Sequence, residues 1–245
     1  MATRFESDKY TPQAGKDGGL DPATYEKGTD LTLAPFMGGM IGWWKFDESG
    51  SVVNDSSGFG KNGTMYVSST PTDNHTSSGC KAGTCANFSG TNYYISILGT
   101  NYNVSNGYSM TAWFKPNALG AGSNIFLGSY SVPAYLSFHT AGSALFQSAQ
   151  ISSTQKTLSG VNPVSTGNWY FTAGTFNGST LTTYLNGSYE SSASYPGSGS
   201  LGSGICLGGY NCTIGYWTNG SVDDVRIYNR ALSAAEIAAI YNATK

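Results

Sequence analysis

The sequence SVDDVRIYNRALSAAEI, residues 221–237, contains the clearest strand and helix pattern in the chain. Its first part, residues 221–228, alternates polar and apolar side chains in the manner of a half-buried β-strand. On strict alternation, Asp223, Val225 and Ile227 face one side of this strand. The strand is preceded by Asn219-Gly220, a pair that tolerates the positive φ of tight hairpin turns. We therefore expect it to close an antiparallel sheet.

A short amphipathic helix is predicted directly after this strand. Ser233 and Glu236 have the spacing of a capping box, in which each side chain bonds the backbone N–H of the other residue. Ile237, Ile240 and Tyr241 then supply an apolar stripe on one face. The chain is expected to end with this helix packed on the sheet.

Short strands joined by small polar turns are predicted upstream. Asn177-Gly178 and Asn186-Gly187 are two-residue turn pairs that join three strands within residues 169–192. Only 11% of the residues are charged, as in a β-protein with many turns. We predict an all-β fold, a two-sheet antiparallel jelly-roll sandwich with a C-terminal helix. The Gly- and Ser-rich residues 191–204 are expected to form a long exposed loop.

These motifs resemble a known family. Residues 221–237 resemble the closing strand and helix of laminin G-like jelly-roll domains, in the concanavalin A-like lectin and glucanase superfamily. IGWWKFDESG at 41–50 and NDSSGFGKNGT at 54–64 resemble the family's opening strand and loop. Further matching stretches are ANFSGTNYYI at 86–95 and SMTAWFKP at 109–116. The resemblance implies one jelly-roll domain over residues 41–245, and it indicates fold more strongly than function.

The four cysteines form two close pairs, Cys80 with Cys85 and Cys206 with Cys212. A four-thiolate zinc site would suit two pairs, but these spacings are wider than the usual two-residue knuckle. We favour two local disulfides, which indicate an oxidising compartment. The sequence contains neither a leader peptide nor an apolar run long enough to cross a bilayer. Because the cysteines indicate export, we expect the natural chain to begin upstream of Met1.

Residues 1–40 differ from the rest, since they are richer in charge and lack strand alternation. We predict an N-terminal extension that ends at Gly38-Gly39. It resembles the segment that follows the N-terminal helix in type IV pilin-like proteins, which implies a head displayed on a surface or pilus, with pilus subunits as partners. An ordinary interdomain linker explains the segment equally well.

Oxygen donors gather in the loop at residues 54–63 and in the closing strand. The resemblance implies a structural calcium here, held by Asp55 and Asn62 through side chains and by Gly58 through its carbonyl. Asp223 or Asp224 would add a carboxylate from the closing strand, and oxygen is the ligand that calcium prefers. The alternative is an Asx-turn with solvated acids.

Catalysis and nucleic-acid binding lack support in the sequence. A retaining glucanase needs two carboxylates about 5 Å apart, yet no Asp or Glu occurs between His75 and Tyr189. The net charge of −2 provides no basic patch for phosphates.

Aromatic residues in polar loops are the remaining candidates for ligand contacts. Tyr210, Tyr216 and Trp217 are the predicted ligand-binding residues, because sugars stack on aromatic rings, and Tyr102 and Tyr135 lie in similar loops. We therefore predict a non-catalytic extracellular recognition or adhesion module that binds a glycan or another cell-surface ligand. The first alternative is a structural subunit of a pilus-like filament without its own ligand, and a divergent glycoside hydrolase ranks last.

Overall fold

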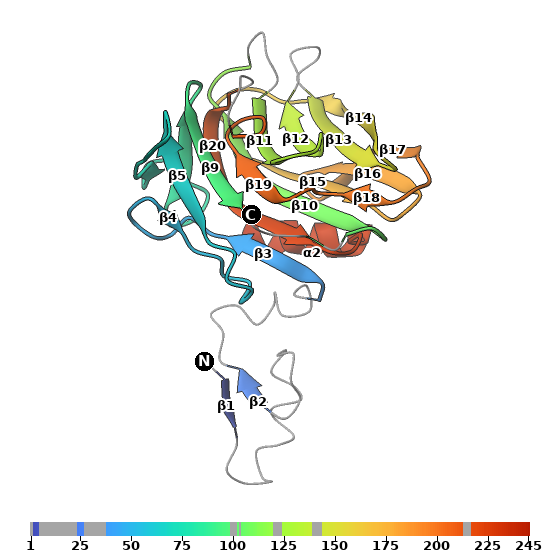
Figure 1. Cartoon of the computed structure of the whole chain (residues 1–245), viewed down its shortest axis with the longest axis horizontal. Coiled ribbons are helices and arrows are strands. Elements are labelled where there is room, and N and C mark those ends of the chain that lie inside the picture. Colours follow the sequence, from blue (N-terminus) through green and yellow to red (C-terminus); the bar gives the residue numbers. More distant parts are fainter. Residues whose placement is uncertain are drawn as a thin grey trace.

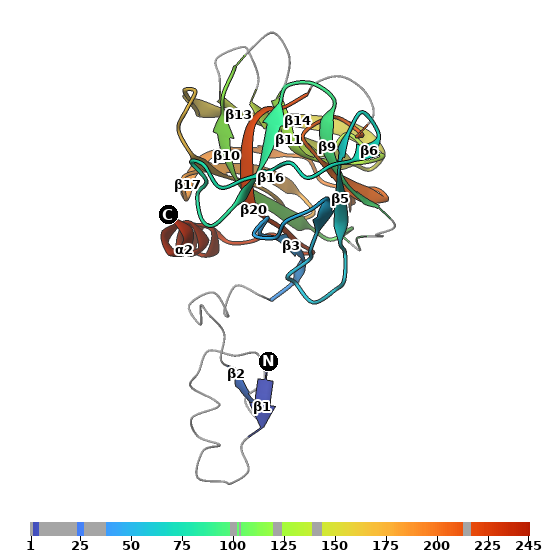
Figure 2. The same ribbon diagram turned by 90° about the vertical axis from the view of Figure 1, so that its left-hand side faces the viewer.

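The computed structural model describes residues 38–98, 102, 104–119, 124–138, 144–212 and 217–245, together with the backbone of residues 2–4 and 24–26. Within these residues, the strands form two large antiparallel sheets, one of eight strands and one of ten, and a separate two-stranded sheet. The two large sheets pack face to face (Figures 1 and 2). The predicted two-sheet sandwich is confirmed.

The eight-stranded sheet contains the first and last strands of the sandwich. In order across the sheet, its strands are β17 (Ser188–Ser194), β16 (Thr180–Leu185), β15 (Tyr170–Phe176), β10 (Tyr108–Pro116), β20 (Asn219–Tyr228), β8 (Cys85–Ser89) and β7 (His75–Thr76), with β3 (Met40–Trp44) also paired to β20. The ten-stranded sheet contains, in order, β14 (Thr154–Pro163), β13 (Ala144–Ile151), β12 (Tyr135–Phe138), β11 (Asn124–Ser129), β19 (Gly204–Leu207), β9 (Tyr93–Leu98), β5 (Gly63–Val67) and β4 (Val52–Val53), with β18 (Gly199–Ser200) beside β13 and β6 (Thr70–Pro71) beside β5.

Strand β20 is the predicted closing strand, but strict alternation along it is wrong. Asp224 has a φ of +48°, and the register against β10 shifts between Thr111 and Trp113. This bulge adds one residue to β20, so Val222 and Val225 both point into the core between the sheets. Asp223 therefore does not share a face with Val225.

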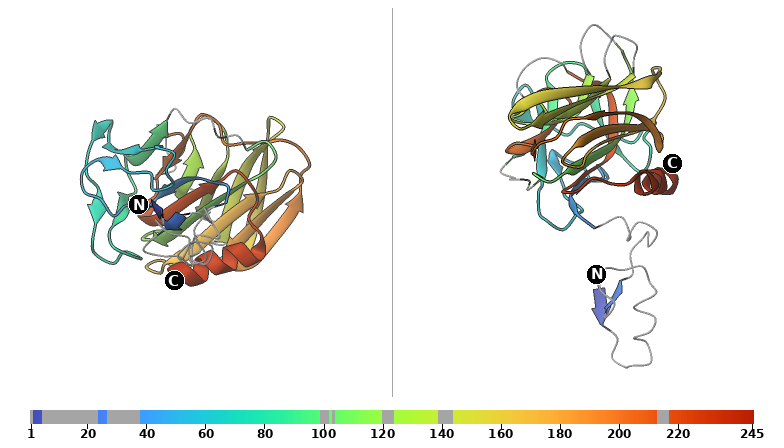
Figure 3. Two further views of the ribbon diagram at one scale, coloured as in Figure 1. Left: turned by 90° about the horizontal axis from the view of Figure 1, so that it is seen from below. Right: turned by 90° about the vertical axis from the view of Figure 1, so that its right-hand side faces the viewer.

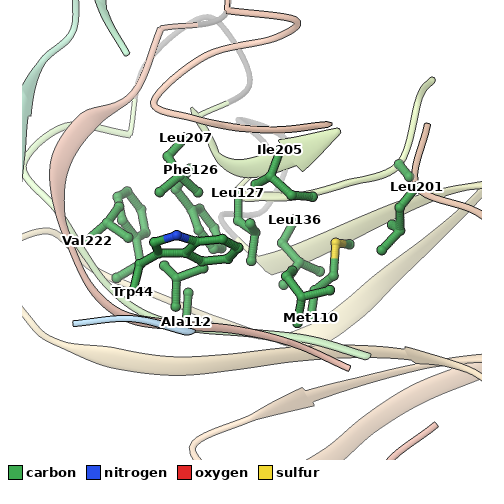
Figure 4. Packing of buried hydrophobic residues seen from close by; sticks show 14 of the residues in the cluster. Trp44, Met110, Ala112, Phe126, Leu127, Leu136, Leu201, Ile205, Leu207 and Val222 are labelled. Carbon is green, nitrogen blue, oxygen red and sulfur yellow. The ribbon is translucent and has the colours of Figure 1, made fainter. Parts of the chain in front are cut away.

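Aromatic side chains fill the core between the two sheets. Trp44 is fully buried and lies among residues of both sheets, including Ala112 and Leu207 (Figure 4). Phe114 of β10 stacks on Phe126 of β11 across the interface, with ring centroids 4.5 Å apart. Burying each large apolar side chain stabilises the fold by about 1.5–3 kcal/mol.

Helix α2 (Ala234–Thr244) covers the outer face of the eight-stranded sheet (Figure 3). Ile237 and Ile240 pack there against Trp113 in a second buried cluster. The capping box predicted for Ser233 and Glu236 is confirmed. This outer face is therefore covered over the area where the helix lies.

The predicted meander of β15, β16 and β17 is confirmed, but the predicted long loop at residues 191–204 is wrong. Strand β17 continues to Ser194, β18 follows, and Leu201 is fully buried. Small residues allow this close packing. A Cβ atom at Gly199 would lie only 2.9 Å from the Phe176 ring. A segment rich in Gly and Ser can therefore pack into the sandwich instead of leaving it.

Side chains close the sandwich where edge strands β14 and β17 meet. Glu190 of β17 is 6% exposed, and its Oε2 accepts hydrogen bonds from Val161 N at 2.8 Å and Asn162 N at 2.9 Å. The Asn162 side-chain amide donates to the other oxygen. Ser191 Oγ donates to Ser159 O at 2.5 Å. These bonds take the place of a neighbouring strand along β14.

The N-terminal region is described only in part. Strand β1 (Ala2–Arg4) pairs antiparallel with β2 (Thr24–Glu26). The rest of residues 1–37 lies outside the described residues. The extension and its pilin-like character stay predictions.

Replacing Glu190 by Ala should lower the free energy of unfolding by about 1–2 kcal/mol, because three donors lose a charged acceptor. Urea denaturation measures this loss, and amide exchange at Val161 and Asn162 should become faster. The exposed Ser194→Ala on the same strand is the control, expected to change stability by less than about 0.5 kcal/mol. Equal effects of the two substitutions would contradict this role of Glu190.

A second prediction concerns pH. Hydrogen bonds from Arg230 lower the pKa of Glu236 to about 2, below its usual value of 4.5. The carboxylate therefore stabilises the fold above about pH 4.5, and this contribution is lost as the pH falls towards 2. Glu236→Gln should cost about 1 kcal/mol at neutral pH, and the difference from wild type should shrink below about pH 4. Urea unfolding over this pH range measures the difference in free energy of unfolding between the two proteins. A difference that does not change with pH would show that the charge of Glu236 is not involved.

Candidate functional site

Three aromatic side chains form a stack on the outer face of the ten-stranded sheet. Met65 of β5 and Ile95 of β9 point into the core, so their neighbours Tyr66 and Tyr94 point outward. These tyrosines are paired across the strands, with ring centroids 5.1 Å apart and planes 19° apart. Trp217 continues the stack, 6.2 Å from Tyr94. The three rings are partly exposed, and the stack runs across the strands.

Backbone contacts fix the position of Trp217. The next residue, Thr218, donates through N to Gly208 O at 2.9 Å and through Oγ1 to Ile125 O at 2.7 Å. A Cβ atom at Gly209 would lie 2.8 Å from the Trp217 ring. The chain therefore needs glycine at this position to leave room for the indole.

A second aromatic group lies on the same face. Tyr135 of β12 and Phe146 of β13 stack with ring centroids 6.2 Å apart, and Tyr210 meets Tyr135 edge-on at 6.1 Å. Two of the predicted ligand-binding residues, Tyr210 and Trp217, thus lie on this face but in different groups. The third, Tyr216, lies outside the described residues.

Both predicted disulfides are present, with Cα–Cα distances of 5.5 Å in each. Cys206 of β19 lies between strands β11 and β9, and its bond to Cys212 closes the loop that carries Tyr210. The alternative of a four-thiolate zinc site is wrong, because all four sulfurs are in disulfides. Disulfides are typical of exported proteins. In the described part of the chain, no helix has the length and apolarity to cross a membrane.

The sequence-based selection missed Tyr66, Tyr94 and Phe146. Each lies within a strand, so its position shows which face it occupies only once the neighbouring strands are known. Tyr102, which was expected beside an exposed loop, is only 7% exposed, and Lys61 Nζ lies 4.4 Å from the centre of its ring. Loop location is therefore a poor guide to exposure in this sandwich.

The loop at residues 54–63 is organised around Asp55. Its Oδ1 accepts from Trp43 N at 3.0 Å and Ser57 N at 2.9 Å, and its Oδ2 accepts from Lys61 N at 2.9 Å. Asn62 Oδ1 accepts from Asp55 N at 2.9 Å. Burial alone would raise the pKa of Asp55, but the hydrogen bonds hold that pKa below its usual value. This geometry has the features of the Asx-turn alternative.

The closing-strand acids have separate partners. Asp224 forms an ion pair with Arg226 at 2.9 Å and accepts from Trp43 Nε1 at 2.6 Å. Asp223 Oδ2 accepts from Lys81 N at 3.2 Å and Ala82 N at 3.1 Å. Burial raises the pKa of Asp223 to about 7.

A calcium ion would have to displace N–H donors from these carboxylates. Gly58, whose carbonyl was a predicted ligand, lies in an exposed turn with a φ of +87°. Over the described ranges, no group of three or more His, Cys, Asp and Glu side chains could hold a metal ion. The calcium site therefore stays a prediction.

The aromatic face carries no carboxylate pair. The strands that form it, β5, β9, β11, β12, β13 and β19, contain no Asp or Glu. Glu190 lies in the other sheet, bonded to β14. His75 Nδ1 is 2.8 Å from Asp73 Oδ1, and His139 lies outside the described residues.

Comparisons place this fold among known proteins. A family model described as the concanavalin A-like lectin/glucanases superfamily matches residues 89–238. Domain 4 of AbnA, a GH43 extracellular arabinanase from Geobacillus stearothermophilus solved in complex with arabinotriose, is similar with a TM-score of 0.63 and 23% identity, over 84% of this chain and 98% of that chain. No curated protein matches the sequence.

Two larger proteins contain a similar domain. The binding domain of botulinum neurotoxin serotype D has a TM-score of 0.63 and 17% identity, over 86% of this chain and 52% of that chain. Trypanosoma rangeli sialidase has a TM-score of 0.57 and 14% identity, over 83% of this chain and 32% of that chain. At these identities the likeness shows the fold alone.

The calcium prediction has a direct test. An extracellular module with a dissociation constant near 0.5 mM gains about 1.4 kcal/mol in about 5 mM calcium, which raises the melting temperature by roughly 3–6 °C. We expect this rise relative to chelator, and its loss in Asp55→Ala. The control Asp73→Asn, in a different loop, should keep it. Equal melting temperatures in calcium and chelator would show that N–H donors, and no metal, hold these carboxylates.

Proposed function

The chain belongs to the concanavalin A-like lectin/glucanases superfamily, and we propose that its sandwich is a non-catalytic module that binds carbohydrate. The proposed binding surface is the outer face of the ten-stranded sheet. Its contacts are the Tyr66, Tyr94 and Trp217 stack and the group around Tyr135 and Tyr210.

The stacked aromatic face is the observation that carries this proposal. The stacked rings turn their faces toward one another, so the row offers a ligand its ring edges and the outer faces of its terminal rings, on which the C–H face of a sugar can pack. The outer face of the eight-stranded sheet is less suited, because α2 covers part of it.

Similar structures support a binding role. Domain 4 of AbnA was solved with arabinotriose, and the similar part of the botulinum structure makes up 52% of a toxin binding domain. The aromatic strands lack the two acids of a glycosidase, so we assign the module recognition and no hydrolysis.

We further propose that the module acts outside the cell and is displayed as a head on a surface or pilin-like protein. The two disulfides support an oxidising environment. The resemblance of residues 1–40 to pilin-like proteins supports the anchor. The partners would then be cell-surface glycans and, in a filament, other pilus subunits.

Trp217→Ala tests the proposed face. A glycan array probed with the wild-type protein identifies a bound sugar, and calorimetry then measures its affinity. We expect Trp217→Ala to weaken binding about tenfold, because it removes a stacking surface worth about 1.4 kcal/mol. Tyr94→Ala should weaken binding too, because it removes the ring on which Trp217 stacks. The control is Tyr189→Ala, an aromatic residue 58% exposed on the other sheet. Failure of the folded protein to bind any glycan, or a loss confined to Tyr189→Ala, would overturn the proposal.

A further inference from the structure

We infer that the ligand of the aromatic face is an uncharged glycan chain of several sugar units, lying across the strands. This inference rests on the proposed carbohydrate-binding function and specifies the chemistry of its ligand. Two independent features of the face carry it, the separation of its aromatic groups and the lack of charged residues in its strands.

The two aromatic groups are separated across the sheet. From Tyr94 on β9 to Tyr135 on β12 there are three strand-to-strand steps, through β19 and β11. At about 4.8 Å for each step, the separation across the strands is about 14 Å. Tyr66 and Phe146 lie one strand further out at either end. A single sugar can stack on only one of these groups, whereas a chain of several units is long enough to reach both.

A row of paired residues runs from Tyr135 to Ser96, which lies two residues along β9 from Tyr94. The middle members of this row, Gly128 and Cys206, are buried. Tyr135 pairs with Gly128, Gly128 with Cys206, and Cys206 with Ser96. The Cys206 disulfide fixes the loop that carries Tyr210 to this row. The two groups are thus held at a fixed separation before any ligand arrives, which lowers the entropy cost of binding.

The six strands that form the face contain no Lys, Arg, Asp or Glu. Asp73, next to Asn74 at the Tyr66 end, is an anion and offers no cationic partner. Within residues 74–222 the only Lys, Arg, Asp and Glu residues are Lys81, Lys115, Lys156 and Glu190, and none of them lies in the six strands of the aromatic face. Even the parts of this segment outside the described residues, such as 139–143 and 213–216, contain none of these four residue types.

Each of these four charged side chains contacts residues outside the aromatic face. Lys81 Nζ lies 4.2 Å from the Trp113 ring centre on the eight-stranded sheet, and Lys115 Nζ lies 5.2 Å from that of Trp169. Lys156 Nζ lies 5.6 Å from the Tyr195 ring centre, on the side of β17. Glu190 is bonded to β14. A sulfated, sialylated or uronic glycan would therefore lose hydration on this face without gaining a cationic partner. Stacking and neutral hydrogen bonds favour an uncharged chain.

The test measures binding by calorimetry with neutral probes of two, three and six units, namely arabinobiose, arabinotriose and arabinohexaose and the corresponding cello- and xylo-oligosaccharides. Heparin and polysialic acid are the anionic probes. Each titration is run at about 20 mM and about 500 mM sodium chloride, since salt screens exposed charge pairs. Trp217→Ala, Tyr135→Ala and the control Tyr189→Ala are compared, with melting temperatures as the check on folding.

We expect a neutral six-unit chain to bind at least tenfold more tightly than its two-unit counterpart. Its affinity should change less than twofold with salt, and Tyr135→Ala should weaken the six-unit chain more than the two-unit one. Binding of heparin or polysialic acid that salt weakens and Trp217→Ala abolishes would overturn this inference and leave the proposed function intact. Equal affinity for two and six neutral units would also overturn it. The absence of any binding would instead overturn the proposed function itself.

Discussion

The pairing of β20 with three other strands is the constraint on which the sandwich depends. Its backbone bonds β10 along one side, while β3 and β8 share the other side. The first and last strands of the sandwich are therefore neighbours. The bulge at Asp224 adds a local constraint, because Asp224 is held by the buried Arg226 and by the Trp43 indole. Since an unpaired buried charge is costly, the bulge, the ion pair and the position of β3 depend on one another.

Much of this arrangement could be predicted from the sequence. The closing strand, the capped helix, the meander and both disulfides follow from local patterns at short range. The bulge at Asp224 could not be predicted, because period-two alternation assumes a regular ladder and gives no signal for an extra residue. The prediction of a long loop at residues 191–204 was wrong for a related reason. Gly and Ser also allow strands to pack closely, as Gly199 does against Phe176.

The candidate site could be predicted only in part. Tyr210 and Trp217 lie in loops and attracted attention for that reason, whereas Tyr66 and Tyr94 are ordinary strand residues in sequence. Their pairing is non-local, because it depends on the register between β5 and β9. For Asp55 and Asp223 the sequence suggested a site that the described contacts do not favour. Their residue types suit a cation, but folding supplies N–H donors from several segments, and sequence spacing does not reveal them.

The position of β20 also has a consequence for how the chain is made. Strand β10, which pairs with β20 in the middle of the sheet, ends at Pro116. One edge of β10 therefore stays unpaired until β20, which begins at Asn219, has been made. A chain that emerges from the ribosome, or passes through a secretion channel, from its N-terminus exposes most of the sandwich before the strand that completes the eight-stranded sheet arrives. Contacts so distant in sequence form slowly and late. The eight-stranded sheet can therefore close only after nearly all of the chain has been made.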